Sequence, residues 1–288
     1  MRFVEDFIDY ELIDADQGER LERWGDIILI RPDPTIMWQT EKKDKRWFDA
    51  HAVYHRSNSG GGYWETLNKV PDVWSINYRD LEFRLKPMGF KHTGLFPEQA
   101  VNWALAMDLI KKANRKIKVL NLFAYTGGAT VACLKAGAEV THVDASKGMV
   151  QWAKENAIVS GMGDAPVRWL VDDCLKFVKR EIRRGNKYDA IIMDPPSYGR
   201  GPGGEIWKLE QQISELLLET GKLFSDKPLF FFLNSYTTGL SPTILNYLTE
   251  LYISHGKGQN VFTDEIGLKV TNKPIVLPCG NTTVWIGE

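Results

Sequence analysis

The stretch Val119–Val143, VLNLFAYTGGATVACLKAGAEVTHV, decides the fold. Apolar, strand-like residues break at Gly127 and Gly128, continue in a helical pattern, and return as a second apolar strand that is followed by Asp144. This pattern is typical of the first half of a nucleotide-binding βαβ unit. The paired glycines let the backbone turn tightly and approach a ligand that a Cβ atom would push away. Asp144 lies near the spacing of about 20 residues at which such an acid meets a ribose hydroxyl.

From about residue 97 onward, helical and strand patterns alternate along the chain. Strands separated by helices of this length imply right-handed crossovers and a mainly parallel, doubly wound α/β sheet. We expect helices at 97–113, 128–136, 147–160, 173–184, 205–224 and 242–254, and strands at 117–123, 139–143, 167–171, 188–193, 228–233 and, in the tail, near 260–270 and 282–287.

Residues 1–90 have a different pattern, in which short β-type runs are cut by turn signals such as Pro32-Asp33-Pro34. We therefore expect a small β-rich N-terminal domain at 1–90 and a main domain at 91–288. Two roles are open for the tryptophans of the first region, because such rings fill a small core or stack bases. These tryptophans are Trp24, Trp38, Trp47, Trp64 and Trp74.

The charge of the chain limits the kinds of partner that it binds. The formal net charge of −1 gives no global electrostatic case for nucleic acid, so such a partner would have to bind through local patches. Basic clusters occur at 42–46, 111–118 and 179–187, where they either track a phosphate backbone or form solvated helix faces. Arg200 is the best single candidate for a phosphate contact.

The cysteines and the apolar runs indicate the compartment. Cys133, Cys174 and Cys279 form no C-x-x-C pair and have no neighbouring histidine at metal-ligand spacing, which predicts reduced thiols and no metal site. The acidic N-terminus does not read as a signal peptide, and no run approaches the roughly 18–20 apolar residues of a membrane span. We expect a cytoplasmic protein with no membrane partner.

The candidate cofactor residues all follow predicted strands, and ligands of open α/β sheets bind beyond the carboxyl ends of the strands. Four strand ends that converge are more specific than any single motif. The candidates are Asn121, Phe123, Tyr125, Thr126 and Gly127 around the first strand end, Asp144 and Ala145 after the second, Asp172 and Asp173 after the third, and Asp194 after the fourth.

Helix capping bears on which of these acids are left for a ligand. Ser146 is a good cap for the helix that follows Asp144, which leaves Asp144 for the ribose. One member of the pair Asp172-Asp173 should cap the next helix while the other meets an adenine amine. We choose Asp173 for the adenine and keep Asp172 as the alternative.

A dinucleotide oxidoreductase is the competing interpretation of the glycine turn. Its G-x-G-x-x-G fingerprint brings a pyrophosphate to a helix N-terminus. Residues 123–128 read FAYTGG, which lacks the spaced second and third glycines. S-adenosylmethionine has no phosphate and tolerates this departure, so a methyltransferase is favoured.

Four segments in order, NLFAYTGG, HVDASKGMV, WLVDDCLKFV and IIMDPPSYGRG, resemble the class I S-adenosylmethionine-dependent methyltransferases. Within that class the chain resembles the branch that modifies bases of large-subunit ribosomal RNA, whose fourth motif also runs D-P-P-x-aromatic. The resemblance covers about residues 83–288 and implies a Rossmann-like, seven-stranded sheet, S-adenosyl-L-methionine as cofactor and ribosomal RNA as substrate. The segment HTGLFPEQ at 92–99 resembles one that lies over the cofactor in this branch, which adds Phe96 and Gln99 as cofactor contacts.

The residues around the D-P-P turn are the candidates for the transfer step, and they favour a nitrogen of the base over carbon-5. Asp194 and the Pro195 carbonyl would orient an exocyclic amine, whereas Tyr198 and Asn234 would hold a guanine for attack by nitrogen-7. Methylation at carbon-5 of a pyrimidine needs a cysteine thiolate. The positions at which such relatives carry this cysteine hold Ser197 and Asn234-Ser235 here.

Two other functions stay open at this stage. One is methylation of a small molecule or a protein with the same cofactor, and the other is an RNA-binding or scaffold role without turnover. The glycine-rich loop GRGPGG at 199–204 directly follows the D-P-P turn and is a candidate lid over the site.

Overall fold

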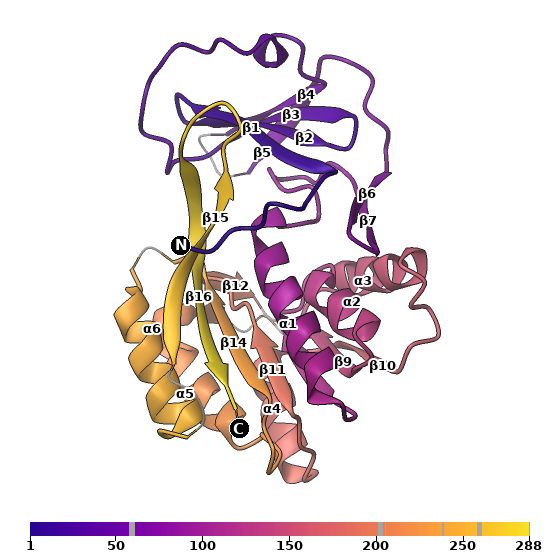
Figure 1. The fold of residues 1–288 in the computed structure, drawn as a ribbon, viewed down its shortest axis with the longest axis vertical. Coiled ribbons are helices and arrows are strands. Elements are labelled where there is room, and N and C mark those ends of the chain that lie inside the picture. The colour runs from indigo at the N-terminus through magenta and orange to yellow at the C-terminus, as the bar shows by residue number, and fades with distance from the viewer. Residues whose placement is uncertain (58–60, 201–203, 205, 238, 258–260, 288) are drawn as a thin grey trace. The chain divides into compact units, whose positions relative to one another are not determined.

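The computed structural model describes residues 1–57, 61–200, 204, 206–237, 239–257 and 261–287. The chain divides into two compact units (Figure 1). The first unit comprises Met1–Val101 and Gly267–Cys279, and the second comprises Asn102–Ile266 and Gly280–Glu288. The domain boundary that the sequence places at residues 90 and 91 stays a prediction.

The second unit is built on a seven-stranded sheet whose order is β10-β9-β8-β11-β14-β16-β15. In this sheet β10, β9, β8, β11 and β14 run parallel, and β16 pairs antiparallel with β14. Strand order reverses between β8 and β11, which is where a doubly wound sheet binds its ligand. The strands are β8 (Lys118–Leu122), β9 (Glu139–Asp144), β10 (Val167–Val171), β11 (Ala190–Met193), β14 (Phe230–Ser235), β15 (Phe262–Lys269) and β16 (Val276–Ile286).

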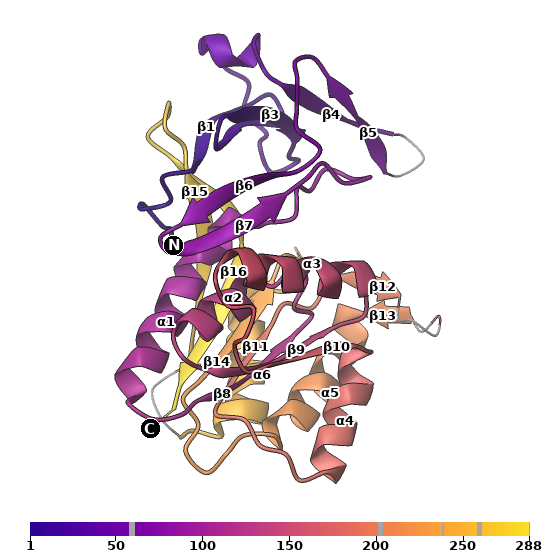
Figure 2. The same ribbon diagram turned by 90° about the vertical axis from the view of Figure 1, so that its right-hand side faces the viewer.

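Helices cover both faces of this sheet, which makes the fold doubly wound, as the sequence predicts (Figure 2). One apolar core joins the sheet to α1 and α2, and the other joins it to α4, α5 and α6. Phe230 to Leu233 of β14 are fully buried, as expected of a central strand that is covered on both faces. The helices are α1 (Ala100–Ala113), α2 (Gly128–Lys135), α3 (Lys147–Val159), α4 (Cys174–Arg183), α5 (Leu209–Gly221) and α6 (Pro242–Thr249), which a π-helical turn extends over Glu250–Ser254.

The first unit is rich in β-structure, as predicted. Its five-stranded sheet has the order β1-β2-β3-β4-β5, with all pairs antiparallel except β3 and β4. Two further strands form a ribbon, and a 3-10 turn covers Pro97–Gln99. The strands are β1 (Tyr10–Asp16), β2 (Glu19–Trp24), β3 (Ile27–Pro32), β4 (Ala52–Arg56) and β5 (Gly62–Thr66), with β6 (Trp74–Tyr78) and β7 (Leu81–Leu85) in the ribbon.

The tryptophans of this unit mainly have a structural role, in its core or in bonds to its backbone. Trp24 and Trp47 are buried. Trp38, Trp64 and Trp74 are half-buried, and each donates its indole N–H to a backbone carbonyl, at 2.6, 3.0 and 3.1 Å respectively. These bonds satisfy the polar edge of each ring while its apolar body packs against the unit.

The segment 205–224 differs from the predicted single helix. Ile206–Lys208 forms β13, which pairs antiparallel with β12 (Tyr198–Arg200), and α5 begins only at Leu209. The bulky Ile206 and Trp207 suit a strand, and pairing with residues before the loop outweighs the local helical pattern. Residues 201–203 of the candidate lid lie outside the described residues.

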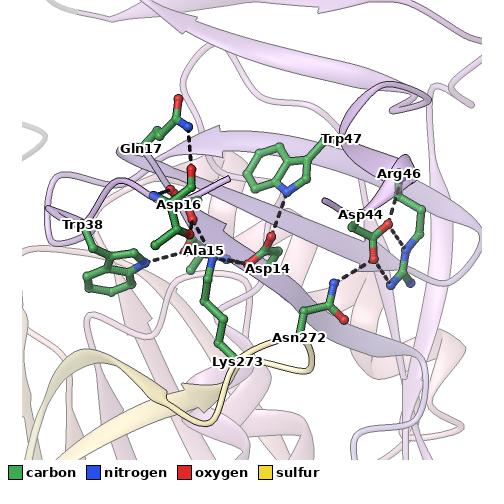
Figure 3. A network of polar contacts seen from close by, with 11 residues as sticks. Asp14, Ala15, Asp16, Gln17, Trp38, Asp44, Arg46, Trp47, Asn272 and Lys273 are labelled. Atoms are coloured by element: carbon green, nitrogen blue, oxygen red, sulfur yellow. Dashed lines mark hydrogen bonds and ion pairs between the residues drawn. The ribbon is translucent and has the colours of Figure 1, made fainter. Parts of the chain in front are cut away.

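A polar network joins the tail segment of the first unit to β1 (Figure 3). The Lys273 ammonium donates to Asp14 Oδ1 at 2.6 Å, Asp16 Oδ2 at 2.7 Å and the Ala15 carbonyl at 2.9 Å. Burial opposes ionisation of Asp16, but bonds from Lys273 and Thr40 outweigh it and lower its pKa to about 2. The Asp16 carboxylate is therefore ionised at neutral pH, and it shares the Lys273 ammonium with Asp14.

Replacing Lys273 by methionine should lower the free energy of unfolding at pH 7 by about 2–3 kcal/mol, because Asp14 and Asp16 would stay buried without their cation. The pKa of Asp16 in the folded state lies below its value in the unfolded state, which is about 3.9. Its stabilisation is therefore fully present above that pH and is lost as the pH falls toward 2. Urea unfolding at neutral and acidic pH measures both effects.

Lys43→Met is the matched control, since the Lys43–Glu41 pair is exposed on both sides. Equal unfolding midpoints for Lys273→Met and the wild type at pH 7 would show that the network does not stabilise this unit.

Candidate functional site

The candidate site lies where β8, β9, β10 and β11 end. These strands are parallel neighbours, so the loops that follow them emerge at one edge of the sheet. The edge includes the reversal of strand order between β8 and β11. The sequence-predicted segments after these four strands therefore do converge.

The loop between β8 and α2 has an unusual backbone. Phe123, Tyr125 and Gly127 have φ angles of +54°, +50° and +82°. Bulky side chains rarely adopt this left-handed conformation, which persists only when the surroundings fix it. Here Asn156 donates to the Thr126 carbonyl at 2.8 Å, and the Tyr125 N–H donates to Asp144 Oδ2 at 2.9 Å.

The two glycines of this loop serve helix packing as well as the turn. A Cβ atom on Gly127 would lie 2.8 Å from the Ala153 Cβ of α3, and one on Gly128 would lie 2.6 Å from the Trp103 ring of α1. Both distances are too short for carbon atoms. The missing Cβ atoms therefore allow close helix packing, in addition to the tight turn and the ligand approach that the sequence predicts.

Asp144 joins two of the loops. Its Oδ2 accepts from the Tyr125 N–H and its Oδ1 accepts from the Ser146 N–H at 2.8 Å. Burial raises the pKa of this carboxyl, and the two N–H bonds oppose the rise. Ser146 caps α3 through the Met149 N–H, which confirms the predicted cap. Each Asp144 oxygen retains a second lone pair, so the carboxylate can also accept ribose hydroxyls beside half-buried Ala145.

The structure differs from the prediction in which of the two acids after β10 caps the next helix. Asp173, predicted to meet the adenine, is the residue that caps α4, through Oδ1 and the Lys176 N–H at 2.8 Å. Asp172 forms an ion pair with Arg180. The cap uses one oxygen of Asp173, and the contact of either acid with an adenine amine stays a prediction.

Asn121 belongs to a buried polar network. It donates to Thr130 Oγ1 at 2.9 Å, and Thr130 in turn contacts His142 Nδ1 at 2.9 Å. Burial lowers the pKa of His142 to about 3, so this ring is neutral. The network joins β8, α2 and β9 inside the fold, and the contact of Asn121 with a cofactor stays a prediction.

The D-P-P turn after β11 is held from two sides. The Asp194 N–H donates to the Leu122 carbonyl at 3.3 Å. The Pro196 carbonyl, just after buried Pro195, accepts from the Trp207 indole N–H at 2.6 Å, and that indole also contacts the Phe123 ring at a centroid distance of 5.3 Å. Trp207 therefore links the turn to the loop after β8.

Tyr198 and Asn234 lie in different environments. Tyr198, in β12, has 53% of its surface exposed, which leaves its ring accessible to a base. Asn234 is buried, and its Oδ1 accepts from Asn102 Nδ2 at 3.1 Å and from Thr282 Oγ1 at 2.7 Å. The fold uses this oxygen, so only the amino end of the Asn234 amide remains for a substrate.

Sequence reasoning missed three residues that position the loops, namely Asn156, Cys174 and Trp207. Cys174 Sγ accepts from the Phe123 N–H at 3.3 Å. Burial raises the pKa of this thiol well above its usual value, so it is protonated. Contacts between loops that are distant in the sequence leave no local sequence pattern. The only signal for the role of Cys174 in holding the Phe123 loop was its position next to Asp173.

Phe96 and Gln99 belong to the first unit, where Phe96 precedes the 3-10 turn and Gln99 is its last residue. Their contact with a cofactor stays a prediction. Within the described residues, no group of three or more His, Cys, Asp or Glu side chains is arranged to hold a metal ion. No helix in the described ranges is long and apolar enough to cross a membrane.

The family model for S-adenosylmethionine-dependent methyltransferases matches residues 48–227. The chain belongs to this family. A crystal structure of the SAM-dependent methyltransferase from Agrobacterium tumefaciens is 35% identical, with a TM-score of 0.93 over 97% of this chain and 91% of that one. A methyltransferase structure from Streptococcus mutans shares the fold at 18% identity, with a TM-score of 0.73 over 97% of this chain and 75% of that one.

Among curated relatives, the Ribosomal RNA large subunit methyltransferase K/L of Shewanella frigidimarina is 35% identical over 156 residues, which are 54% of this chain and 21% of that protein. The chain thus spans about a fifth of the length of such relatives. The methyltransferase fold, the cofactor and the reaction class that the sequence predicts are confirmed by the family.

Asp144→Ala should weaken binding of S-adenosylmethionine by about 1–3 kcal/mol, because the change removes a charged acceptor from the ribose and frees the Tyr125 and Ser146 N–H groups. Isothermal titration measures the affinity. Asp144→Asn should lose less, since one acceptor oxygen remains, and the exposed Asp164→Ala is the control. Unchanged affinity in folded Asp144→Ala would show that another group binds the ribose.

A variant in which Cys133, Cys174 and Cys279 are all replaced by serine should retain methyl transfer if it folds. Burial raises the pKa of Cys133 to about 12 and holds those of the other two thiols well above their usual values, so none supplies a thiolate at neutral pH. A covalent adduct with a fluorinated pyrimidine RNA, traced to one of these thiols, would refute the prediction.

Proposed function

We propose that this chain transfers the methyl group of S-adenosylmethionine to a nitrogen atom of a base in large-subunit ribosomal RNA. The arrangement that carries the proposal is the D-P-P-S-Y turn beside the cofactor loops at the reversal of strand order. The name of the curated relatives supports the RNA substrate. The cytoplasm is the compartment that this substrate implies.

The residues at the strand ends fit the cofactor. Asp144 offers acceptor lone pairs to the ribose, and the second carboxylate oxygen of Asp173 offers one to the adenine amine. The loop at 123–127 brings the backbone beside both acids. The bound cofactor supplies an electrophilic methyl group on a sulfonium.

The protein then has to hold a nucleophile in line with that methyl group. The exposed Tyr198 ring stacks on a base that has left its helix, while Asp194 and the Pro195 carbonyl accept hydrogen bonds from its exocyclic amine. The two prolines and the Trp207 bond keep these acceptors in place before the base arrives. Methylation at carbon-5 needs a cysteine thiolate. The positions that would carry this cysteine hold Ser197 and Asn234 here.

The test is methyl transfer from labelled S-adenosylmethionine to ribosomal RNA that was made without modification, followed by mass spectrometry of the nucleosides. We expect one methylated base with the methyl group on nitrogen. A methyl group on carbon-5, or transfer only to a small molecule or a protein, would refute the proposal.

Asp194→Ala and Tyr198→Ala should separate cofactor binding from transfer. Both variants should keep the affinity for S-adenosylmethionine within about 1 kcal/mol, whereas Asp194→Ala should lose on the order of 100-fold in turnover, because the base is no longer oriented. Tyr198→Phe keeps the aromatic ring and should retain most of the activity that Tyr198→Ala loses. Normal rates for both alanine variants would make the turn a scaffold only.

A further inference from the structure

A face of the first unit combines an exposed aromatic ring with cations for which the described residues include no acidic partner. It is formed by the β4–β5 hairpin and the loop at 86–93. The loop is closed by bonds from the Lys86 N–H to the Thr93 carbonyl at 3.1 Å and from the Met88 N–H to the His92 carbonyl at 3.2 Å. Trp64 of β5 donates its indole N–H to the Met88 carbonyl at 3.0 Å and so joins the hairpin to the loop.

The two sides of the hairpin differ in charge. Side chains alternate along a strand, so Arg56 lies on the side of Trp64, which faces the loop. His55, Tyr63 and Glu65 lie on the opposite side, where His55 pairs with Glu65 at 2.7 Å. The acid of this hairpin is therefore directed away from Arg56.

The loop adds a second cation. Lys91 is half-buried, and its ammonium donates to the Pro32 carbonyl at 3.4 Å. Burial, together with the positive charges of Arg20, Arg31 and Arg56, lowers the pKa of Lys91 to about 8, and Asp33 only partly offsets them. Arg20 and Arg31 have their own carboxylates, Asp33 and Glu22.

Arg56 and Lys91 therefore remain without a carboxylate partner in the described part of the chain. They create a local positive potential that an anion would lower. The overall net charge of −1 gives no indication of this local feature.

Aromatic rings lie beside these cations. Phe90, at the tip of the loop, has 45% of its surface exposed. Its ring contacts His92 at a centroid distance of 5.5 Å, and His92 contacts Phe96 at 5.1 Å. Burial lowers the pKa of His92 to about 3, so the imidazole is a neutral ring between two phenylalanines. Phe90 thus presents a supported aromatic surface to solvent.

We propose that this basic-aromatic face, defined by Arg56, Phe90, Lys91 and His92, binds an unpaired strand of the RNA substrate. Arg56 and Lys91 contact phosphates, and a base stacks on Phe90, which is how proteins hold single strands without reading their sequence. A paired strand would keep its bases inside the duplex and leave Phe90 without a partner. The proposal rests on the RNA substrate of the proposed function.

The experiment measures fluorescence anisotropy of a labelled oligouridine of about 12 nucleotides with the full-length chain, at salt concentrations from roughly 50 to 200 mM. Phe90→Ala should weaken binding by about tenfold at an unchanged salt dependence, because it removes stacking alone. The double variant Arg56→Gln, Lys91→Gln should weaken binding and reduce the slope of log affinity against log salt by about 1.4, which corresponds to two phosphates.

Matched controls share the chemistry but not the position. Tyr63→Ala removes an exposed aromatic ring from the opposite side of the hairpin, and Lys269→Gln removes an exposed lysine of the same unit. Both should bind oligouridine as the wild type does. Duplex RNA of the same length should bind more weakly than the single strand.

Wild-type affinity in the Phe90 variant and the double variant, equal losses in the controls, or equal binding of duplex RNA would each overturn the proposal. Methyl transfer to ribosomal RNA, measured in parallel, separates the two hypotheses. If the wild type methylates that RNA while the face variants bind and methylate normally, only the basic-aromatic face is wrong. If the wild type neither binds oligouridine nor methylates ribosomal RNA, the RNA-binding role of the face and the proposed function are both wrong.

Discussion

The carboxylate of Asp144 is the interaction on which the site depends. It accepts one backbone N–H from the loop after β8 and another from the loop after its own strand, so a single side chain fixes two loops. The first of these loops holds two aromatic residues in a left-handed conformation, which costs free energy. Asn156 and Cys174 add bonds to the same loop and help to offset that cost. The cofactor loops are thus preorganised by contacts from α3, α4 and β9.

The transfer side of the site is fixed in a similar way, but from a hairpin. Trp207 holds the Pro196 carbonyl with its indole N–H and packs its ring on Phe123. Trp207 therefore contacts both halves of the proposed site, the D-P-P turn through one hydrogen bond and the loop after β8 through an aromatic contact.

The sequence predicts those parts of the fold that depend on local patterns. The strand at 167–171 has the predicted bounds, and the helix after Gly127 begins where the paired glycines place it. The hairpin of β12 and β13 was missed because three-residue strands depend on a partner across a loop and not on their own periodicity. The internal hydrogen bonds of Asn121 and Asn234 could not be predicted, because a position near the carboxyl end of a strand does not tell how a polar side chain is bonded.

The membership of Gly267–Cys279 in the first unit has a consequence for how the chain acquires its structure during synthesis. Residues 1–101 leave the ribosome long before Lys273 does, so Asp14 and Asp16 wait for their cation while the whole second unit is made. The unit that is translated first is therefore among the last to be completed. Until then, its β1 edge carries two carboxylates whose mutual repulsion favours solvent over burial, which delays consolidation of the N-terminal sheet until the tail arrives.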